Sequence, residues 1–273
     1  MESVNSCPYC NSSNREIIRR QTHEDRFLSL INSDLNKIER FWYRCKQCGF
    51  VYRSPRTTRA EEDILYAKLR SFNFLKVTPQ QYFDRLTSLS SNESECYKRV
   101  MFIKEYSNVI DSVLDVGCGG GILLYFIKQC FPEAELTGIE PNKEFAEMVE
   151  KNLGIDVVND VYKAGLISKR FDLILCTDVI EHVSDIYSFW NTIEHNIKVN
   201  GLLFIEVPSI ENFNNVSLEH DVFGSQHLYF YGVSHLKEIS MKYGYNIIQN
   251  YTYDTDRGEV VKKDVLLLLK KNI

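Results

Sequence analysis

The stretch that decides the fold is VLDVGCGGGILLYFI, residues 113–127. It opens with a short apolar run typical of a buried strand, and from residue 123 onward apolar residues recur at the spacing of one helix face. Glycines stand between the two patterns. Because they lack Cβ, the backbone there can take positive φ and a ligand can approach closely, while the helix start offers free N–H groups. The stretch therefore predicts a strand, a tight turn and a helix, with a ligand site at the turn.

The spacing within the turn narrows the choice of ligand. It reads Asp115-x-Gly117-x-Gly119-x-Gly121. A dinucleotide fingerprint would need glycine at position 122, where the chain has isoleucine, so the pattern disfavours NAD. The next apolar segment ends in Glu140, about the distance onward at which an acid in such folds accepts hydrogen bonds from ribose hydroxyls. A cofactor with a ribose but no pyrophosphate fits both observations. The alternative is a plain strand-to-helix turn with an unrelated acid nearby.

This pattern resembles the first motif of the class I S-adenosylmethionine-dependent methyltransferases, in which the second strand also ends in an acidic residue. The resemblance is strongest over residues 94–209. It implies that S-adenosylmethionine is the methyl donor, and that Asp160, at the end of the third strand, meets the adenine amino group. Asp160 could instead cap the following turn. The donor-binding residues that the resemblance implies are Asp115, Gly117, Cys118, Gly119, Gly121, Glu140, Pro141, Asp160, Thr177 and Asp178.

Strand and helix patterns alternate beyond the turn, which predicts a parallel sheet with right-handed crossovers and with its ligand at the carboxyl ends of the strands. The expected strands are residues 113–116, 136–140, 155–158, 171–176, 201–208, 245–253 and 260–269. The expected fold class is therefore α/β, and the resemblance implies a Rossmann-like seven-stranded methyltransferase sheet. A small zinc ribbon and a helical segment are expected to precede it. The expected units are 1–59 (ribbon), 60–93 (helical connector or lid) and 94–273 (donor-binding domain).

The zinc prediction comes from two Cys-x-x-Cys pairs, Cys7 with Cys10 and Cys45 with Cys48. Four thiolates make a closed tetrahedral zinc site of the structural kind. Two redox-active pairs are the alternative, but neither pair lies at the strand-to-helix junction that a thioredoxin-like motif requires. Residues 44–53 are expected to form a hairpin beside the second pair. The module resembles the zinc ribbon that precedes the methyltransferase domain in sugar C-methyltransferases and related bacterial polysaccharide-modifying enzymes.

The connector is predicted to be helical from Ala60 to Phe72, with Thr58 as its cap, acids in its first turn and an apolar side. That side is expected to hold Ile64, Leu65, Lys68 and Leu69, and the segment could cover the cofactor cleft. Five aromatic residues could close on a substrate, but aromatic stripes are more often core, and that interpretation is favoured. They are Tyr66, Phe72, Phe74, Tyr82 and Phe83.

Composition is that of an ordinary globular protein, with a formal net charge of −5 over 273 residues. Residues 1–59 hold 11 Lys and Arg against 6 Asp and Glu, which leaves 21 against 31 for the rest of the chain. A basic front module could meet a phosphate-bearing partner. No segment is apolar enough over a sufficient length to suggest a signal peptide or a membrane span, and the remaining cysteines favour reduced thiols. A cytoplasmic protein is expected.

Methyl transfer to an alcohol or acidic carbon needs a base near the fourth strand end. His182 follows Glu181 there, and the resembled enzymes often carry Glu-His at this place. A histidine that only caps or packs under the loop is the alternative. His227, in a loop-like aromatic stretch, is the second candidate. His23, His195 and His235 are expected on the solvated surface, without roles.

Three functions compete. The leading one is methylation of a small sugar-like acceptor, either linked to a nucleotide or part of a surface glycan. The second is RNA methylation with the basic ribbon as the reader, for which the chain offers few surface candidates beyond Arg40, Arg44, Lys46 and Arg53. The third is a non-catalytic binding module, which the intact glycine motif and the row of strand-end acids disfavour.

Overall fold

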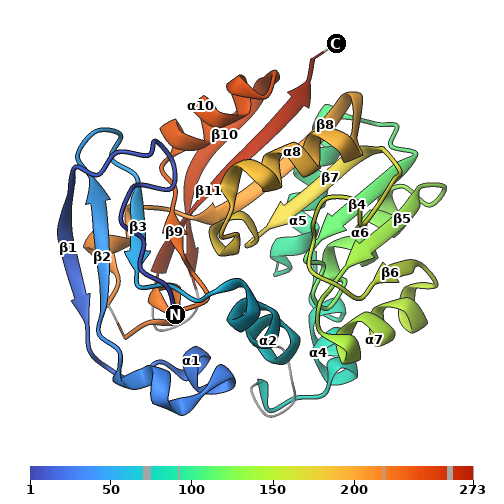
Figure 1. Ribbon diagram of the computed structural model, residues 1–273. Helices are drawn as coiled ribbons and strands as arrows, with labels where there is room; N and C mark the ends of the chain where they lie inside the picture. The colour runs from blue at the N-terminus through green and yellow to red at the C-terminus, as the bar shows by residue number, and fades with distance from the viewer. Residues whose placement is uncertain (70–74, 92, 218, 257–260, 273) are drawn as a thin grey trace.

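The computed structural model describes residues 1–69, 75–91, 93–217, 219–256 and 261–272, and it contains two sheets (Figure 1). The larger sheet has seven strands, five parallel and two, β11 and β10, antiparallel to their neighbours, so the predicted α/β fold is confirmed. Its strands lie in the order β10 (Tyr245–Asp256), β11 (Val261–Lys271), β8 (Ile197–Pro208), β7 (Phe171–Thr177), β4 (Ser112–Val116), β5 (Glu135–Ile139) and β6 (Asp156–Val158).

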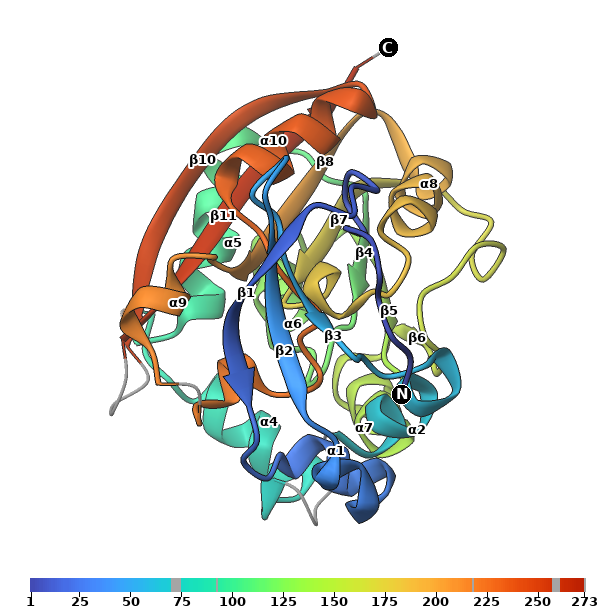
Figure 2. The same cartoon turned by 60° about the vertical axis from the view of Figure 1, so that its left-hand side comes forward.

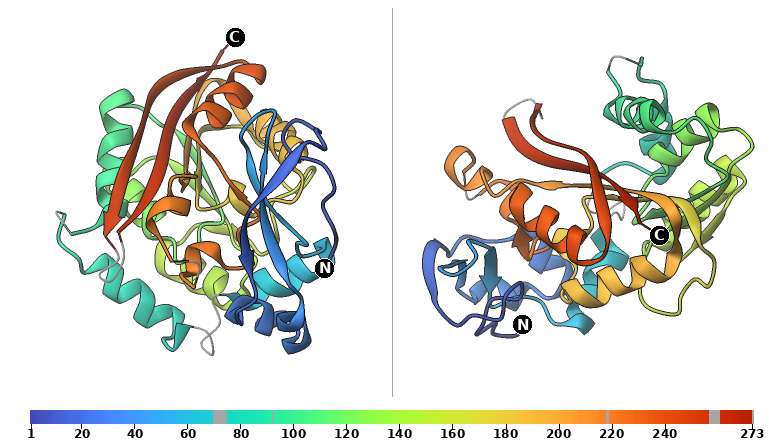
Figure 3. Two further views of the ribbon diagram at one scale, coloured as in Figure 1. Left: turned by 90° about the vertical axis from the view of Figure 1, so that its left-hand side faces the viewer. Right: turned by 90° about the horizontal axis from the view of Figure 1, so that it is seen from above.

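Helices cover both faces of this sheet (Figures 1 and 3). Residues of β4 alternate between the two faces, since Val113 packs in one core and Leu114 and Val116 pack in the other. The helices α5 (Glu95–Tyr106), α6 (Ile122–Cys130) and α7 (Lys143–Leu153) pack on the first face, and α8 (Ile186–Asn196) and α10 (Val233–Lys242) on the second. The helix predicted after the glycine turn is present as α6. Among the described helices none has the length and apolar character needed to cross a bilayer.

The smaller sheet is built from β1 (Arg15–Gln21), β2 (Arg40–Cys45), β3 (Val51–Ser54) and β9 (Tyr229–Phe230). Figure 2 shows β1, β2 and β3 side by side, and β9 is labelled in Figure 1. The predicted hairpin of residues 44–53 is present as β2 and β3. The sequence pattern predicts only a loop around residue 229, but this stretch pairs with β3 through Val51 and Tyr52 and becomes a strand. A strand of two residues is too short to show a period of its own. The N-terminal sheet therefore includes a strand from the C-terminal half of the chain.

Short helices fill the remaining connections. Between β1 and β2 lie α1 (Arg26–Ile31) and η1 (Ser33–Lys37), and between β8 and β9 lie α9 (Asn212–Asn215) and η3 (Asp221–Phe223). The connector holds α2 (Arg59–Leu69) and α4 (Pro79–Thr87), while η2 (Ile180–His182) follows β7. Residues 70–74, with Phe72 and Phe74, lie outside the described part of the chain.

The predicted inner face of α2 is partly wrong. Leu65 is buried, but Ile64 is 42% exposed, and Glu62, one of the acids expected in the first turn and not on the apolar side, is buried. Glu62 turns inward because this side of α2 meets a polar group, the Ser184 hydroxyl, as well as the core. Phe83 lies in the core as predicted, whereas Tyr66 and Tyr82 line cavities.

Trp42 of β2 packs the smaller sheet against the segment of residues 213–230. It is fully buried, and its ring meets those of Phe213, Phe223 and Phe230 edge-on at 5.1 to 6.1 Å. We expect Trp42→Ala to lower the free energy of unfolding by about 3–5 kcal/mol, measured by urea denaturation. Ile17→Ala, at a 56% exposed site on β1, should stay within about 0.5 kcal/mol of the parent. Equal losses from the two variants would contradict this account of the packing.

Candidate active site

The carboxyl ends of β4, β5, β6 and β7 lie along one edge of the sheet, because these strands are parallel and adjacent. At this edge are Asp115 near the end of β4, Glu140 directly after β5, Asp160 after β6, and Thr177 with Asp178 at the end of β7. Two cavities open there, and Gly117 and Asp178 line both of them.

The glycine turn has the backbone that its sequence predicts. Gly117, Gly119 and Gly121 have φ of 70°, 54° and 70°, which side chains with a Cβ adopt at a cost. A Cβ on Gly121 would also lie 2.8 Å from Val149 of α7. Cys118 donates its N–H to the Ile139 carbonyl over 2.9 Å, which ties the turn to β5. The chain thus passes close to its neighbours here and leaves the ligand side of the turn open.

Glu140 has a second role that the sequence analysis missed. Its Oε2 accepts a hydrogen bond from the Gly119 N–H, and its Oε1 accepts one from the Asn142 N–H, both at 2.9 Å. Asn142 in turn caps α7 through the Phe145 N–H. The carboxylate therefore supports the glycine turn and the next helix start, in addition to any bond it offers a ribose.

The larger cavity, of about 480 Å³, is lined on the strand side by Asp115, Gly117, Cys118, Thr177 and Asp178, and on the helix side by α4 and α5. Arg99 of α5 reaches into it and pairs with Glu206 of β8, with Nε 2.7 Å from Oε2. Burial raises the pKa of Glu206 although the Arg99 guanidinium opposes it. No motif signalled this pair. A basic residue on the buried face of α5, between Cys96 and Ile103, is its only trace in the sequence.

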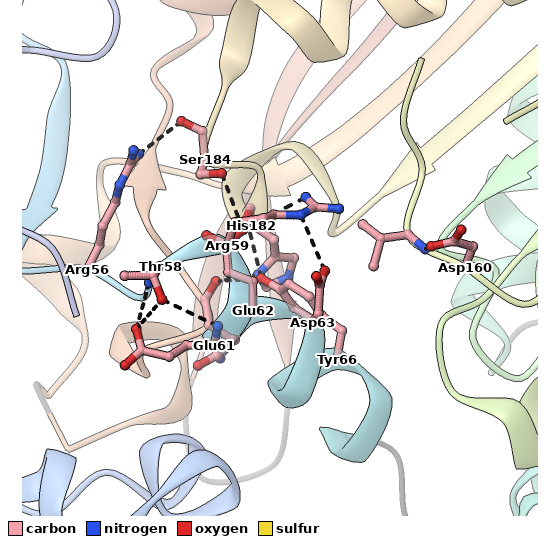
Figure 4. A network of polar contacts seen from close by, with 12 residues as sticks. Arg56, Thr58, Arg59, Glu61, Glu62, Asp63, Tyr66, Asp160, His182 and Ser184 are labelled. Carbon is pink, nitrogen blue, oxygen red and sulfur yellow. Dashed lines mark hydrogen bonds and ion pairs between the residues drawn. The ribbon is translucent and has the colours of Figure 1, made fainter. Parts of the chain in front are cut away.

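The smaller cavity, of about 140 Å³, lies between the strand ends and α2. Glu140, Pro141, Asp160, Asp178 and His182 line it from the sheet, and Arg59, Glu62 and Tyr66 line it from the helix. Figure 4 shows these α2 side chains beside His182, with Asp160 across from them.

The Lys163 ammonium, 2.5 Å from Asp160 Oδ2, holds the pKa of that carboxyl below its usual range.

The two histidines considered as bases lie together. His182, on η2, and His227, from the loop before β9, have ring centroids 4.8 Å apart, and each Nε2 is 3.8 Å from Oε1 of the fully buried Glu181. The Nδ1 atoms lie 2.6 Å from the carbonyls of Gln226 and Val222. A carbonyl oxygen can only accept a hydrogen bond, so each Nδ1 must carry a hydrogen. In the neutral ring Nε2 then has no hydrogen and can accept a proton. The sequence analysis did not assign Glu181 a role.

His235 is not on the surface, and that prediction is wrong. It is 6% exposed, its Nε2 lies 2.8 Å from the Cys48 carbonyl, and its ring packs edge-on against Tyr9 and Phe50. Burial lowers its pKa, although the Cys48 carbonyl opposes the effect. Its polar sequence neighbours face solvent because α10 is amphipathic, and the histidine is on the inner side.

The four cysteines of the N-terminal module converge. Their sulfur atoms lie within 4.8 Å of one another, with Cys7 3.7 Å from Cys48 and Cys10 3.5 Å from Cys45. Tetrahedral zinc with Zn–S bonds of about 2.3 Å would hold its sulfurs roughly 3.8 Å apart, so this donor set fits zinc. Burial raises the pKa of the Cys7 thiol to about 12 and also raises the pKa of Cys48, so without a cation both groups stay protonated at neutral pH. A bound metal cation would stabilise their thiolate forms.

Comparison with known proteins agrees with this geometry. A family model described as a methyltransferase domain matches residues 80–250, which is more than half of the chain. The chain belongs to this methyltransferase family. Its fold is also that of a solved S-adenosylmethionine-dependent methyltransferase structure.

Curated relatives match a shorter segment. A ubiquinone biosynthesis O-methyltransferase of Rickettsia akari is 31% identical over 96 residues, covering 34% of this chain and 38% of that protein. An (S)-tetrahydroprotoberberine N-methyltransferase of Eschscholzia californica is 31% identical over 111 residues, covering 38% of this chain and 31% of that protein. The matched segment thus spans less than half the length of these relatives. An S-adenosylmethionine-dependent methyltransferase from Clostridium acetobutylicum has a similar structure, with a TM-score of 0.52, 14% identity, and coverage of 71% and 98% of the two chains.

Gly119→Val tests the turn as the donor site. A β-branched residue at φ 54° strains the backbone, and its side chain would fill the space a ligand needs, so we expect calorimetry to detect no S-adenosylmethionine binding. Gly165→Val is the matched control, since Gly165 also has positive φ (78°) but has open space around it. Unchanged affinity in a folded Gly119→Val protein would remove the turn from the donor site.

Proposed function

We propose that the protein transfers a methyl group from S-adenosylmethionine to a small acceptor, with a sugar, either linked to a nucleotide or part of a surface glycan, as the specific candidate. The observation that carries the proposal is that His182, paired with Glu181, lines the same cavity as the glycine turn and Glu140. A proton acceptor thus lies beside the residues suited to hold the donor.

The proposed chemistry divides among the chain's own residues. A bound donor supplies an electrophilic methyl group on sulfur. The glycine turn and Glu140 hold its ribose half, and Asp160 is proposed to meet the adenine. Nε2 of His182 accepts the proton of the acceptor as the acceptor atom attacks the methyl carbon, and the Glu181 carboxylate stabilises the resulting imidazolium. His227, which approaches the same carboxylate but lines neither described cavity, is proposed to fix the position of Glu181.

The acceptor class rests on two kinds of support. The relatives named above are by name an O-methyltransferase of ubiquinone biosynthesis and a tetrahydroprotoberberine N-methyltransferase, whose named compounds are small molecules. The arrangement of a module with two Cys-x-x-Cys pairs before the methyltransferase domain resembles that of sugar C-methyltransferases. RNA is disfavoured, because Arg40 and Arg53, two of the four basic residues considered for an RNA surface, are buried and donate to His23, Gln21 and Phe223. A cytoplasmic location is part of the proposal and is supported by cysteines that form no disulfide.

The experiment that tests the function uses the intact protein, donor labelled on its methyl group, and separate pools of nucleotide sugars, glycolipids and RNA. We expect label to appear in the nucleotide-sugar pool. Label in RNA alone would replace the sugar proposal, and donor binding without transfer to any pool would favour a non-catalytic role.

His182→Ala is expected to lower kcat by about 10² to 10⁴ at saturating acceptor while donor affinity, measured by calorimetry, stays near that of the parent. His227→Ala should lower kcat less, because its effect passes through Glu181. The double variant should be little worse than His182→Ala, as expected for residues that act as one unit. A larger fall from His227→Ala, with His182→Ala near normal, would transfer the base assignment to His227.

The proposal includes a structural zinc ion held by Cys7, Cys10, Cys45 and Cys48, and a module of residues 1–59 followed by a connector (60–93) over the cleft of the domain 94–273. Purified protein is expected to contain about one zinc per chain, and Cys45→Ser to release it. Because the Cys48 carbonyl meets His235 and β3 pairs with β9, faster hydrogen exchange should extend from residues 1–59 to residues 229–235. A metal-free protein with an ordered N-terminal module would contradict the zinc assignment.

A further inference from the structure

Glu62 is a buried carboxylate that the chemistry above does not use. It lies on α2 in the wall of the smaller cavity, and its side chain is 2% exposed. Ser184 Oγ donates to its Oε2 over 3.3 Å, and Arg59 Nη1 lies 4.0 Å from that oxygen (Figure 4). Its other oxygen, Oε1, is buried and has no hydrogen-bond partner among the described residues. The carboxylate is therefore only partly compensated.

The surroundings of Glu62 make its charge responsive to a ligand. Burial raises its pKa to about 7, although Ser184, Arg56 and Arg59 act to lower it. The titratable and charged groups near it on its own side are Arg56, Arg59, Glu2, Tyr66 and Tyr229. Those that line the same cavity from the sheet side are Glu140, Asp160, Asp178 and His182. Near neutral pH the group is thus close to balance between its acid and its carboxylate, and a cation beside it would favour the carboxylate.

The donor carries such a cation at a definable place. Glu140 suits the ribose from the smaller cavity, while Asp115 in the larger cavity offers a carboxylate to the donor's ammonium group. The sulfonium joins these two halves of S-adenosylmethionine. It therefore belongs where the two cavities meet, at Gly117 and Asp178, and the smaller cavity there brings Glu62 and His182 to the same space.

We propose that Glu62 is a specificity residue that favours the charged donor over the neutral product, by placing its carboxylate next to the sulfonium. This inference rests on the proposed function. On transfer, the acceptor atom forms a bond to the methyl carbon, the carbon–sulfur bond pair stays on sulfur, and the acceptor proton passes to His182. Sulfur becomes a neutral thioether, so Glu62 loses its partner and the product S-adenosylhomocysteine is held less firmly than the donor.

The pH dependence follows from the direction of the effect. Donor binding favours ionised Glu62, so binding releases protons below the pKa of about 7, and the preference for donor over product should grow from about pH 6 to about pH 8. Histidines titrate in the same range, and His182 lines the same cavity. Only a comparison with a Glu62 variant isolates the contribution of this carboxylate.

Calorimetry on the intact protein, with S-adenosylmethionine and S-adenosylhomocysteine at about pH 6 and pH 8, provides that comparison. In Glu62→Gln we expect donor affinity at the higher pH to fall on the order of tenfold and product affinity to change by less than about twofold. The part of the rise in donor preference between the two pH values that depends on Glu62 should disappear. Glu62→Asp should retain part of the donor preference. Glu147→Gln is the control, because it removes a 63% exposed carboxylate of α7 outside both cavities.

The outcomes separate the inference from the function on which it rests. A folded Glu62→Gln protein, as judged by its thermal unfolding, that keeps the parental ratio of affinities at both pH values would overturn the role of Glu62 alone. Equal losses of affinity for both ligands would overturn it too, since they would mean that Glu62 only supports α2. If the parent protein binds neither ligand, the proposed function itself fails.

Discussion

The hydrogen bonds from Gly119 and Asn142 to the Glu140 carboxylate are the interaction on which the site depends. They link the turn after β4 to the start of α7 through a residue at the end of β5. Three adjacent elements are thus fixed by one charged group, which is buried and bonded to N–H groups at both of its oxygens. A turn held in this way needs no ligand to keep its shape, which reduces the free energy lost to ordering when a donor binds.

The N-terminal module is part of the same folded body as the catalytic sheet. Its cysteines and Tyr9, Phe50 and Tyr52 belong to the core that also contains α8 and α10. Tyr9 donates to the His235 carbonyl, and Tyr187 of α8 donates to the Tyr9 carbonyl. The loop that carries His227 runs directly into β9, which the module pairs with. A metal in the module would therefore support the position of His227, one of the two histidines of the candidate active site.

Much of the fold could be predicted from the sequence, because its signals are local. The period of apolar residues led to seven strands, and the glycine spacing led to the turn at the correct edge of the sheet. What could not be predicted depends on pairs distant in the chain: β9 with β3, Arg99 with Glu206, and Glu181 between two histidines. The burial of Glu62 could not be predicted for the same reason. An acid in the first turn of a helix is explained by its favourable interaction with the helix dipole, and only the structure shows which surface it faces.

The pairing of β9 with β3 also constrains how the chain folds during synthesis. Trp42 emerges early, but the rings that cover it, from Phe213 to Phe230, follow more than 150 residues later. The first sheet therefore has an open edge and an uncovered aromatic side until nearly the whole catalytic domain has been made. Contacts this distant slow folding and prolong exposure of apolar surface. A metal ion bound early by the two cysteine pairs would fix the arrangement of β1, β2 and β3 before β9 and the aromatic residues that cover Trp42 have been synthesised.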